Sequence, residues 1–198
     1  MKIMNYLKTA MTACGAVLIL ASCTMAPPAG RAAVNSFAHI QPLSLNVSDI
    51  QIFDDFQPTM TDPYIEHTMV NPPYRAAYNM TQRAFTADGI EGVLEVHITD
   101  AGIRQTDRQV KQNNLIKTRE HFYEGALKAE VILISNDSIR QEQGRGQINV
   151  ARQLSVPASM SMTQREMALN GMVEKLVMDY HTGLVDILED DFQLLLKR

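Results

Sequence analysis

Cysteine is scarce in this chain: its 198 residues include two, Cys14 and Cys23, and both lie near the N-terminus. The remainder of the chain therefore cannot form an internal disulfide, and a domain built from it must be held together by its core alone. The chain also lacks an excess of positive charge, because 18 lysines and arginines face 22 aspartates and glutamates, which gives a formal net charge of −4. This mildly acidic balance argues against non-specific binding of nucleic acid.

The N-terminus lacks an apolar run long enough for a transmembrane helix. Its apolar segment, residues 13–20, is shorter than the about 20 residues that a membrane-spanning helix needs. Lys2 and Lys8 precede this segment, and the small residues Ala21 and Ser22 follow it. Positive charge, a short apolar core and then small residues are typical of a secretory signal that is removed on export. An uncleaved anchor, or an ordinary signal peptide with a chance cysteine, is the alternative.

Leu20, Ala21, Ser22 and Cys23 stand in the order of a lipobox, and residues 1–23 resemble the signal of bacterial lipoproteins. The resemblance implies cleavage before Cys23, which would become a diacylglyceryl cysteine carrying further acyl lipid such as palmitate. Stable anchoring takes more than one acyl chain, each buried methylene contributing about 0.8 kcal/mol. Thr24 stands where aspartate would direct retention in the inner membrane, so the resemblance implies the periplasmic face of the outer membrane. Loss of residues 1–22 would remove two lysines and no acids, taking the net charge from −4 to −6.

Three regions follow from composition: the signal peptide at 1–22, a lipid-anchored flexible tether at 23–42, and one periplasmic domain at 43–198. The tether is rich in alanine and proline and poor in large apolar side chains. Within the domain, apolar alternation predicts strands at 43–52, with a bulge near Ser48 and Asp49, and at 94–98, 123–134 and 148–156. The turn between the last two strands is predicted at 135–138, or alternatively at 143–146.

Two helices are predicted from apolar residues at helical spacing. The first spans 74–85, with Asn71 as its N-cap and Gly89 at its end. The second follows a capping box, formed by Ser161 with Gln164 or by Thr163 with Glu166, and carries an apolar stripe over 169–184. Gly183 could break it, with 184–196 forming a second piece. That piece has an apolar stripe of its own, which either packs in the core or offers a surface to another protein.

The order strand, helix, three strands, helix predicts an α+β fold. Its mostly antiparallel sheet of about four strands would carry the helices on one face. This order, the size and the lipobox resemble small α+β envelope lipoproteins of the lipopolysaccharide-assembly or ABC-transport auxiliary type. The chain departs from the lipopolysaccharide-assembly pattern at Thr24 to Pro28, where a glycine and an aromatic residue would lead straight into the first strand. Only Cys23, as the lipid-attachment residue, carries over from the resemblance.

No pattern predicts a catalytic site, a metal site or a cofactor other than the lipid on Cys23. The five histidines are spread singly without metal-ligand spacing, and no Gly-x-Ser-x-Gly elbow is present. The acidic residues around the first strand lack the regular spacing of a calcium loop and are interpreted as a solvated loop; they are Asp49, Asp54, Asp55 and Asp62. A hydrolase using this acidic cluster is the least favoured hypothesis.

Residues 104–119 are the most basic stretch of the chain. This stretch, a long loop or the arms of an extended hairpin, could contact anionic lipid, lipopolysaccharide phosphates or an acidic partner, or could be a solvated polar segment. Its candidate contacts are Arg104, Arg108, Lys111, Lys117 and Arg119. The sequence therefore predicts a non-enzymatic, membrane-anchored accessory or assembly subunit of an envelope complex, with a protein partner and no nucleic acid. The alternative is a lipid- or glycolipid-binding module of envelope lipid transport.

Overall fold

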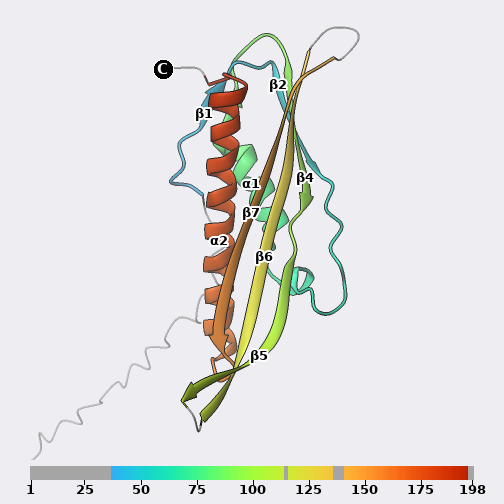
Figure 1. Ribbon diagram of the computed structural model, residues 1–198. Helices are drawn as coiled ribbons and strands as arrows, with labels where there is room; N and C mark the ends of the chain where they lie inside the picture. Colours follow the sequence, from blue (N-terminus) through green and yellow to red (C-terminus); the bar gives the residue numbers. More distant parts are fainter. Residues whose placement is uncertain (1–36, 114–115, 136–140, 196–198) are drawn as a thin grey trace, which may run out of the picture. The chain divides into compact units, whose positions relative to one another are not determined.

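A computed structural model describes residues 37–113, 116–135 and 141–195, all within one compact unit (Figure 1). Cys23, the predicted signal peptide and residues 23–36 of the predicted tether lie outside these residues. The last residues assigned to the tether contact the domain: Phe37 is 5% exposed within the core, and Ile40 packs against it. Among the described residues, no helix combines the length and hydropathy needed to cross a membrane.

The main sheet is built around one long strand, β6 (Ile116–Ile134). One edge of β6 pairs antiparallel with β7 (Glu142–Pro157). The other edge is shared by β4 (Val93–Asp100) and β5 (Ile103–Asn113), which run in the same direction and are separated by a short break. β2 (Asp49–Asp54) adds to β4 in parallel. The mostly antiparallel α+β fold is thus confirmed, with five strands because the predicted strand at 94–98 is followed in line by β5.

The predicted first strand is wrong in one respect: it is two strands in two sheets. β1 (Leu43–Leu45) pairs in parallel with β3 (Phe85–Ala87), whereas β2 joins the main sheet. The chain changes partner between them, because Asn46 donates its N–H to the carbonyl of Leu194 and Ser48 donates to that of Gly92. The bulge expected near Ser48 and Asp49 is therefore the crossing from one sheet to the other.

The first helix, α1, spans Pro73–Ala84. Its N-cap residue is Pro72, with no side-chain cap, so the assignment of Asn71 as N-cap is wrong; Pro73 occupies the first turn, where its missing N–H costs no hydrogen bond. Gly89 does not end the helix, since Phe85 is already extended. A Cβ on Gly89 would lie 2.5 Å from the backbone carbon of Asn46. Glycine is therefore needed there because two backbone segments approach closely.

The second helix, α2 (Met162–Asp186), begins with the predicted capping box between Ser161 and Gln164. The helix continues through Gly183 into a π-helical turn, η2 (Ile187–Asp191), so of the two alternatives left open at Gly183 the uninterrupted helix is the correct one. A Cβ on Gly183 would lie 3.2 Å from a methyl group of Ile148 on β7. This glycine therefore marks a close helix–sheet contact.

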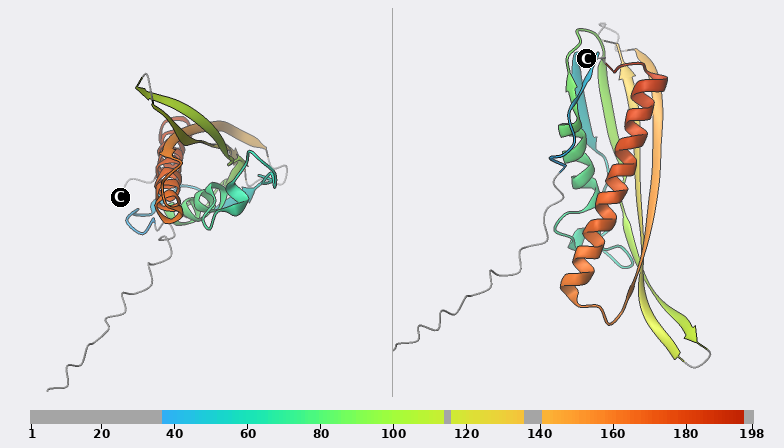
Figure 2. Two further views of the ribbon diagram at one scale, coloured as in Figure 1. Left: turned by 90° about the horizontal axis from the view of Figure 1, so that it is seen from below. Right: turned by 90° about the vertical axis from the view of Figure 1, so that its left-hand side faces the viewer.

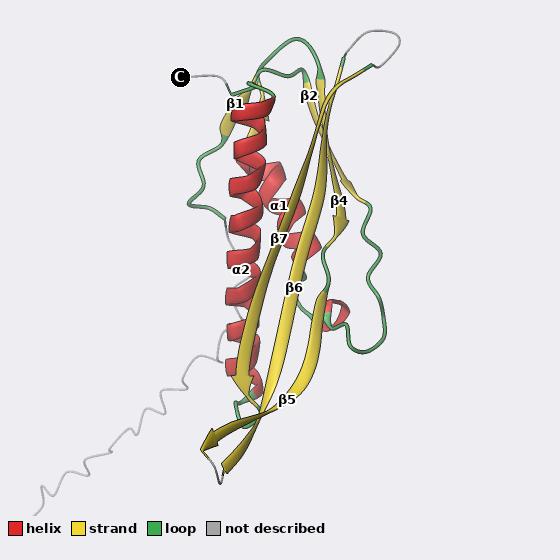
Figure 3. Ribbon diagram, in the orientation of Figure 1, coloured by secondary structure: helices red, strands yellow, loops and turns green. Residues whose placement is uncertain are grey.

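Both helices cover the same face of the main sheet, as Figures 2 and 3 show. Tyr180 of α2 and Thr81 of α1 are both buried and share a hydrogen bond of 2.8 Å between their hydroxyl oxygens. The apolar C-terminal stripe packs in the core, because Leu184, Leu188 and Leu194 are buried. Of the two interpretations of this stripe, packing in the core is confirmed, although the helix does not turn back at Gly183.

Gly144 and Gly146, the alternative turn, lie inside β7. Strand alternation directs both toward the helices. Added Cβ atoms would meet the ring of Phe192 and the side chain of Ile187, each at 2.8 Å. These glycines thus allow the end of α2 and η2 to approach the sheet. The turn between β6 and β7 instead falls between Ile134 and Glu142, and residues 136–140 lie outside the described part.

Candidate functional site

The basic stretch 104–119 forms the arms of an extended hairpin, which confirms one of the two predicted alternatives. The pairing of β7 with β6 ends at Glu120, and one further backbone bond joins Ala158 to Arg119 (2.9 Å). On the other edge, the last backbone bond is donated by Gln105 to Pro63 (2.8 Å). We call the described residues 108–113 and 116–119 the distal hairpin; among the described residues, no third strand pairs with it (Figure 2).

Strand alternation divides the predicted basic contacts between the two faces of this hairpin. Arg104 and Arg108 share one face, and the guanidinium of Arg108 lies 3.3 Å from the ring centroid of Phe122. Lys111 and Arg119 are on the opposite face, where Arg119 lies 3.8 Å from Asp107. The side chain of Lys117 lies outside the described part of the structure. The four side chains that the structure describes therefore do not converge on one pocket.

A cavity of about 370 Å³ lies on the helix-covered side of the hairpin's base. Three segments enclose it: the loop before α1 with its short 3-10 helix η1 (Glu66–Thr68), strands β5 and β6, and the first turns of α2. Its lining comprises Ile65, Thr68, Met69, Val70, Gln105, Tyr123, Met162, Arg165, Glu166, Leu169 and Asn170. The predicted contacts Arg104, Arg108 and Lys111 do not line it.

Two polar groups of this cavity lack hydrogen-bond partners among the described residues: the hydroxyl of Tyr123 and Nε of Arg165. Tyr123 is fully buried. Burial raises the pKa of its phenol, and the guanidinium of Arg165, which lies close to the hydroxyl but outside hydrogen-bond geometry, lowers that pKa in part. The phenol is therefore neutral near pH 7, and both residues present N–H or O–H donors.

Sequence reasoning missed both residues of this cavity. Tyr123 marked the start of a strand, and Arg165 lay among the polar residues that follow the capping box. Their only shared signal is periodicity: Tyr123 lies on the helix-covered face of β6, and Arg165 lies one turn before Leu169 of the apolar stripe. A cationic residue in line with an apolar stripe is the pattern that could have identified Arg165.

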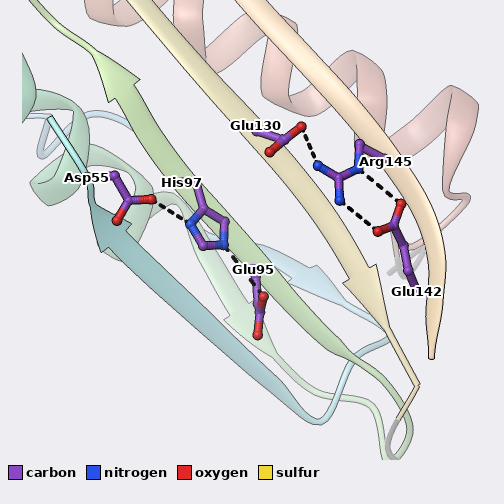
Figure 4. A network of polar contacts seen from close by, with 6 residues as sticks. All are labelled: Asp55, Glu95, His97, Glu130, Glu142 and Arg145. Atoms are coloured by element: carbon purple, nitrogen blue, oxygen red, sulfur yellow. Dashed lines mark hydrogen bonds and ion pairs between the residues drawn. The ribbon is translucent and has the colours of Figure 1, made fainter. Parts of the chain in front are cut away.

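The opposite face of the sheet is polar and carries two clusters of ion pairs (Figure 4). In one, Nδ1 of His97 lies 2.7 Å from Asp55, and Nε2 lies 3.5 Å from Glu95. In the other, Arg145 pairs with Glu142 and Glu130, and the hydrogen bonds that its guanidinium donates to these carboxylates raise its pKa. These contacts neutralise charge across neighbouring strands.

The acidic residues near the first strand form no metal cluster within the described ranges, where no three histidine, cysteine or acidic side chains are placed to share an ion. Asp55 instead pairs with His97, and Asp49 accepts from the side-chain amide of Gln51 (2.9 Å). Burial raises the pKa of Asp54, and its neighbour Asp55 adds to that rise. His121 pairs with Asp107 at 2.7 Å.

Neither a protein-family model nor a curated protein matches this chain. Three solved structures of lipoproteins are similar to it over most of their length. The first is a minor lipoprotein from Acinetobacter baumannii, with 12% identity and a TM-score of 0.33 over 79% of this chain and 100% of that one. The second is rare lipoprotein B from Shewanella oneidensis, with 10% identity and a TM-score of 0.39 over 73% of this chain and 98% of that one. The third is an uncharacterized lipoprotein B from Nitrosomonas europaea, with 13% identity and a TM-score of 0.39 over 76% of this chain and 90% of that one. A likeness at these scores assigns neither family nor function. The lipoprotein interpretation therefore depends on the residues around Cys23.

Proposed function

We propose that this chain is a lipid-anchored envelope lipoprotein that acts as a non-enzymatic accessory subunit of an envelope complex. Leu20, Ala21, Ser22 and Cys23 support the anchor, and through it a position on the periplasmic face of the outer membrane. The observation that carries the accessory role is the distal hairpin. It extends past the strands that support the rest of the sheet.

The distal hairpin has the features of a docking element. A two-stranded hairpin is marginally stable on its own, and open strand edges can accept a strand from another protein. Arg108, Lys111 and Arg119 are exposed on it, and Val110 is 41% exposed between them. Cations on an open edge also discourage unspecific pairing. A partner strand or loop with acidic side chains would satisfy the edge and the charge together.

Site-specific photocrosslinking in the envelope tests this role. A photoreactive amino acid at Val110 should yield one dominant protein adduct, whereas the same group at Ile90, which is 86% exposed on the loop after β3, should not yield it. The combined Arg108→Gln, Lys111→Gln and Arg119→Gln variant should lose the adduct while keeping its thermal unfolding transition. An adduct that persists in the triple variant, or forms equally from position 90, would refute docking through this hairpin.

The cavity favours a second candidate function, binding of a lipid or glycolipid for envelope transport. A volume of about 370 Å³ with a lining of both apolar and polar side chains is within the range of ligand sites. Envelope phospholipid in detergent should raise the melting temperature of the protein if the cavity binds it. A melting temperature that is independent of added lipid would argue against this candidate.

A further inference from the structure

We propose that the cavity binds an amphiphile with one anionic headgroup, which is held by Arg165 and Tyr123 while the apolar chain lies against Met69, Met162 and Leu169. The inference rests on the second candidate function and specifies its ligand class. Neither the accessory role nor the distal hairpin is needed for it.

Two unpartnered donors in one cavity point to an acceptor that is supplied from outside. Leaving a buried polar group without a hydrogen bond is costly, so native proteins rarely do so without a functional reason. The Tyr123 hydroxyl is such a group, since the residue is fully buried and the oxygen has no partner among the described residues. Nε of Arg165 is a second, in the same cavity lining. Two donors, one of them cationic, match the oxygens of a phosphate or carboxylate.

The position of Arg165 at the start of α2 adds to this preference for an anion. Met162 and Arg165 belong to the first turn of a 25-residue helix. Backbone dipoles make this end of a helix electropositive, which stabilises negative charge nearby. Glu166 also belongs to the lining and is exposed. Its carboxylate should oppose a bound anion, so it provides a substitution with the opposite expected sign.

The apolar part of the lining accounts for the rest of an amphiphile. Val70 and Met162 are 62% and 79% exposed, although both are apolar and both line the cavity. Met69 and Leu169 lie farther in, partly buried against the core. Methionine side chains are unbranched and adapt to chains of different shape. An acyl or alkyl chain would cover these side chains on binding and remove them from water.

Isothermal titration calorimetry on the full-length protein in detergent tests this assignment with three probes. Octyl phosphate has both an anionic group and an apolar chain. 1-Octanol has only the chain, and inorganic phosphate has only the anionic group. Octyl phosphate should bind at least about tenfold more tightly than either of the others, because charge-assisted hydrogen bonds and apolar burial act together. Equal binding of octanol would make the cavity an apolar site, and equal binding of inorganic phosphate a free-anion site; either result overturns the proposal.

Four variants assign the contacts. Arg165→Gln should weaken octyl phosphate binding about tenfold or more and leave octanol unchanged. Tyr123→Phe, which removes only the hydroxyl oxygen, should weaken it about threefold or more, and Glu166→Gln should strengthen it. Arg83→Gln on α1 removes an exposed charge outside the cavity lining and should have no effect. Octyl phosphate bound equally by wild type, Arg165→Gln and Tyr123→Phe would refute these contacts but leave lipid binding standing; failure of every probe to bind would overturn both.

Discussion

A partly buried histidine links stability to pH at the scale of single residues. His181 of α2 lies against the ring of Phe85, with centroids 5.8 Å apart, and its Nε2 has no hydrogen-bond partner among the described residues. Desolvation by burial lowers the pKa of its imidazole. Because the folded protein favours the neutral ring, this contribution to stability is present above the ordinary pKa of about 6.5 and is lost as the pH falls through the lowered value.

Replacing His181 with glutamine should therefore reduce the loss of stability on acidification. We expect the free energy of unfolding by urea to fall less between about pH 7.5 and about pH 5.5 in His181→Gln than in the wild type. His67→Gln, at an exposed position, is the control and should keep the wild-type slope. The other histidines are present in both variants, so their effects cancel in the comparison. Equal slopes in all three proteins would contradict the assignment.

Two tyrosines offer a matched test of what a buried hydroxyl contributes. Tyr180 and Tyr123 are both fully buried, but the hydroxyl of Tyr180 is bonded to Thr81, whereas that of Tyr123 has no partner among the described residues. Tyr180→Phe should lower the free energy of unfolding by about 1 kcal/mol, and Tyr123→Phe should be neutral or stabilising. Urea denaturation of the ligand-free proteins measures both. A larger loss in Tyr123→Phe would show that its hydroxyl is satisfied without a ligand.

At the scale of elements, the two glycines within α2 differ in what surrounds them. A Cβ at Gly171 would meet nothing within 4 Å, whereas one at Gly183 would press on Ile148. Gly171→Ala should raise the free energy of unfolding by about 0.5–1 kcal/mol, because alanine has the higher helix propensity. Gly183→Ala should gain less, since Ile148 must move or α2 must shift. An equal gain at both positions in urea denaturation would mean that the helix does not approach β7 so closely.

Local sequence patterns predicted the elements whose contacts recur at a fixed period. Apolar alternation predicted most of β4 and the parts of β6 and β7 at 123–134 and 148–156, and the capping box at Ser161 predicted the start of α2, because both signals arise within one element. The misplaced features depend on distant partners. Asn46 bonds to Leu194, so the first strand is divided, and Gly144, Gly146 and Gly183 are glycines because a helix and a sheet meet there.

The candidate site was predictable only in part for the same reason. The basic stretch was visible as composition, and one predicted alternative, the hairpin, is correct. Strand alternation then separates Arg104 and Arg108 from Lys111 and Arg119, which a count of charges cannot show. Tyr123 and Arg165 come from a strand and a helix with no shared motif, and only tertiary packing brings them to one cavity.

At the scale of the whole molecule, the two candidate surfaces lie at one end of the main sheet. β6 begins at this end of the sheet, β7 ends there, and α2 starts shortly after the end of β7. The distal hairpin and the cavity are therefore neighbours along β5 and β6. Gln105 and Tyr123 face each other in the pairing and line the cavity, and the distal hairpin follows within a few residues. A ligand in the cavity would therefore lie beside the surface proposed for docking.

The proposed docking role requires that the chain is held at a membrane, and the two cysteines allow a matched test of that anchor. Cys23 follows the lipobox residues, whereas Cys14 lies within the predicted signal peptide. Cells fed radiolabelled palmitate should label the wild type and Cys14→Ser equally, and Cys23→Ser should incorporate none, because acylation needs the thiol. Intact-protein mass spectrometry should also show that Cys23→Ser lacks the mass of the acyl chains on which stable anchoring depends. Label retained in Cys23→Ser, or lost in Cys14→Ser, would refute lipid attachment at Cys23 and with it the proposed position in the envelope.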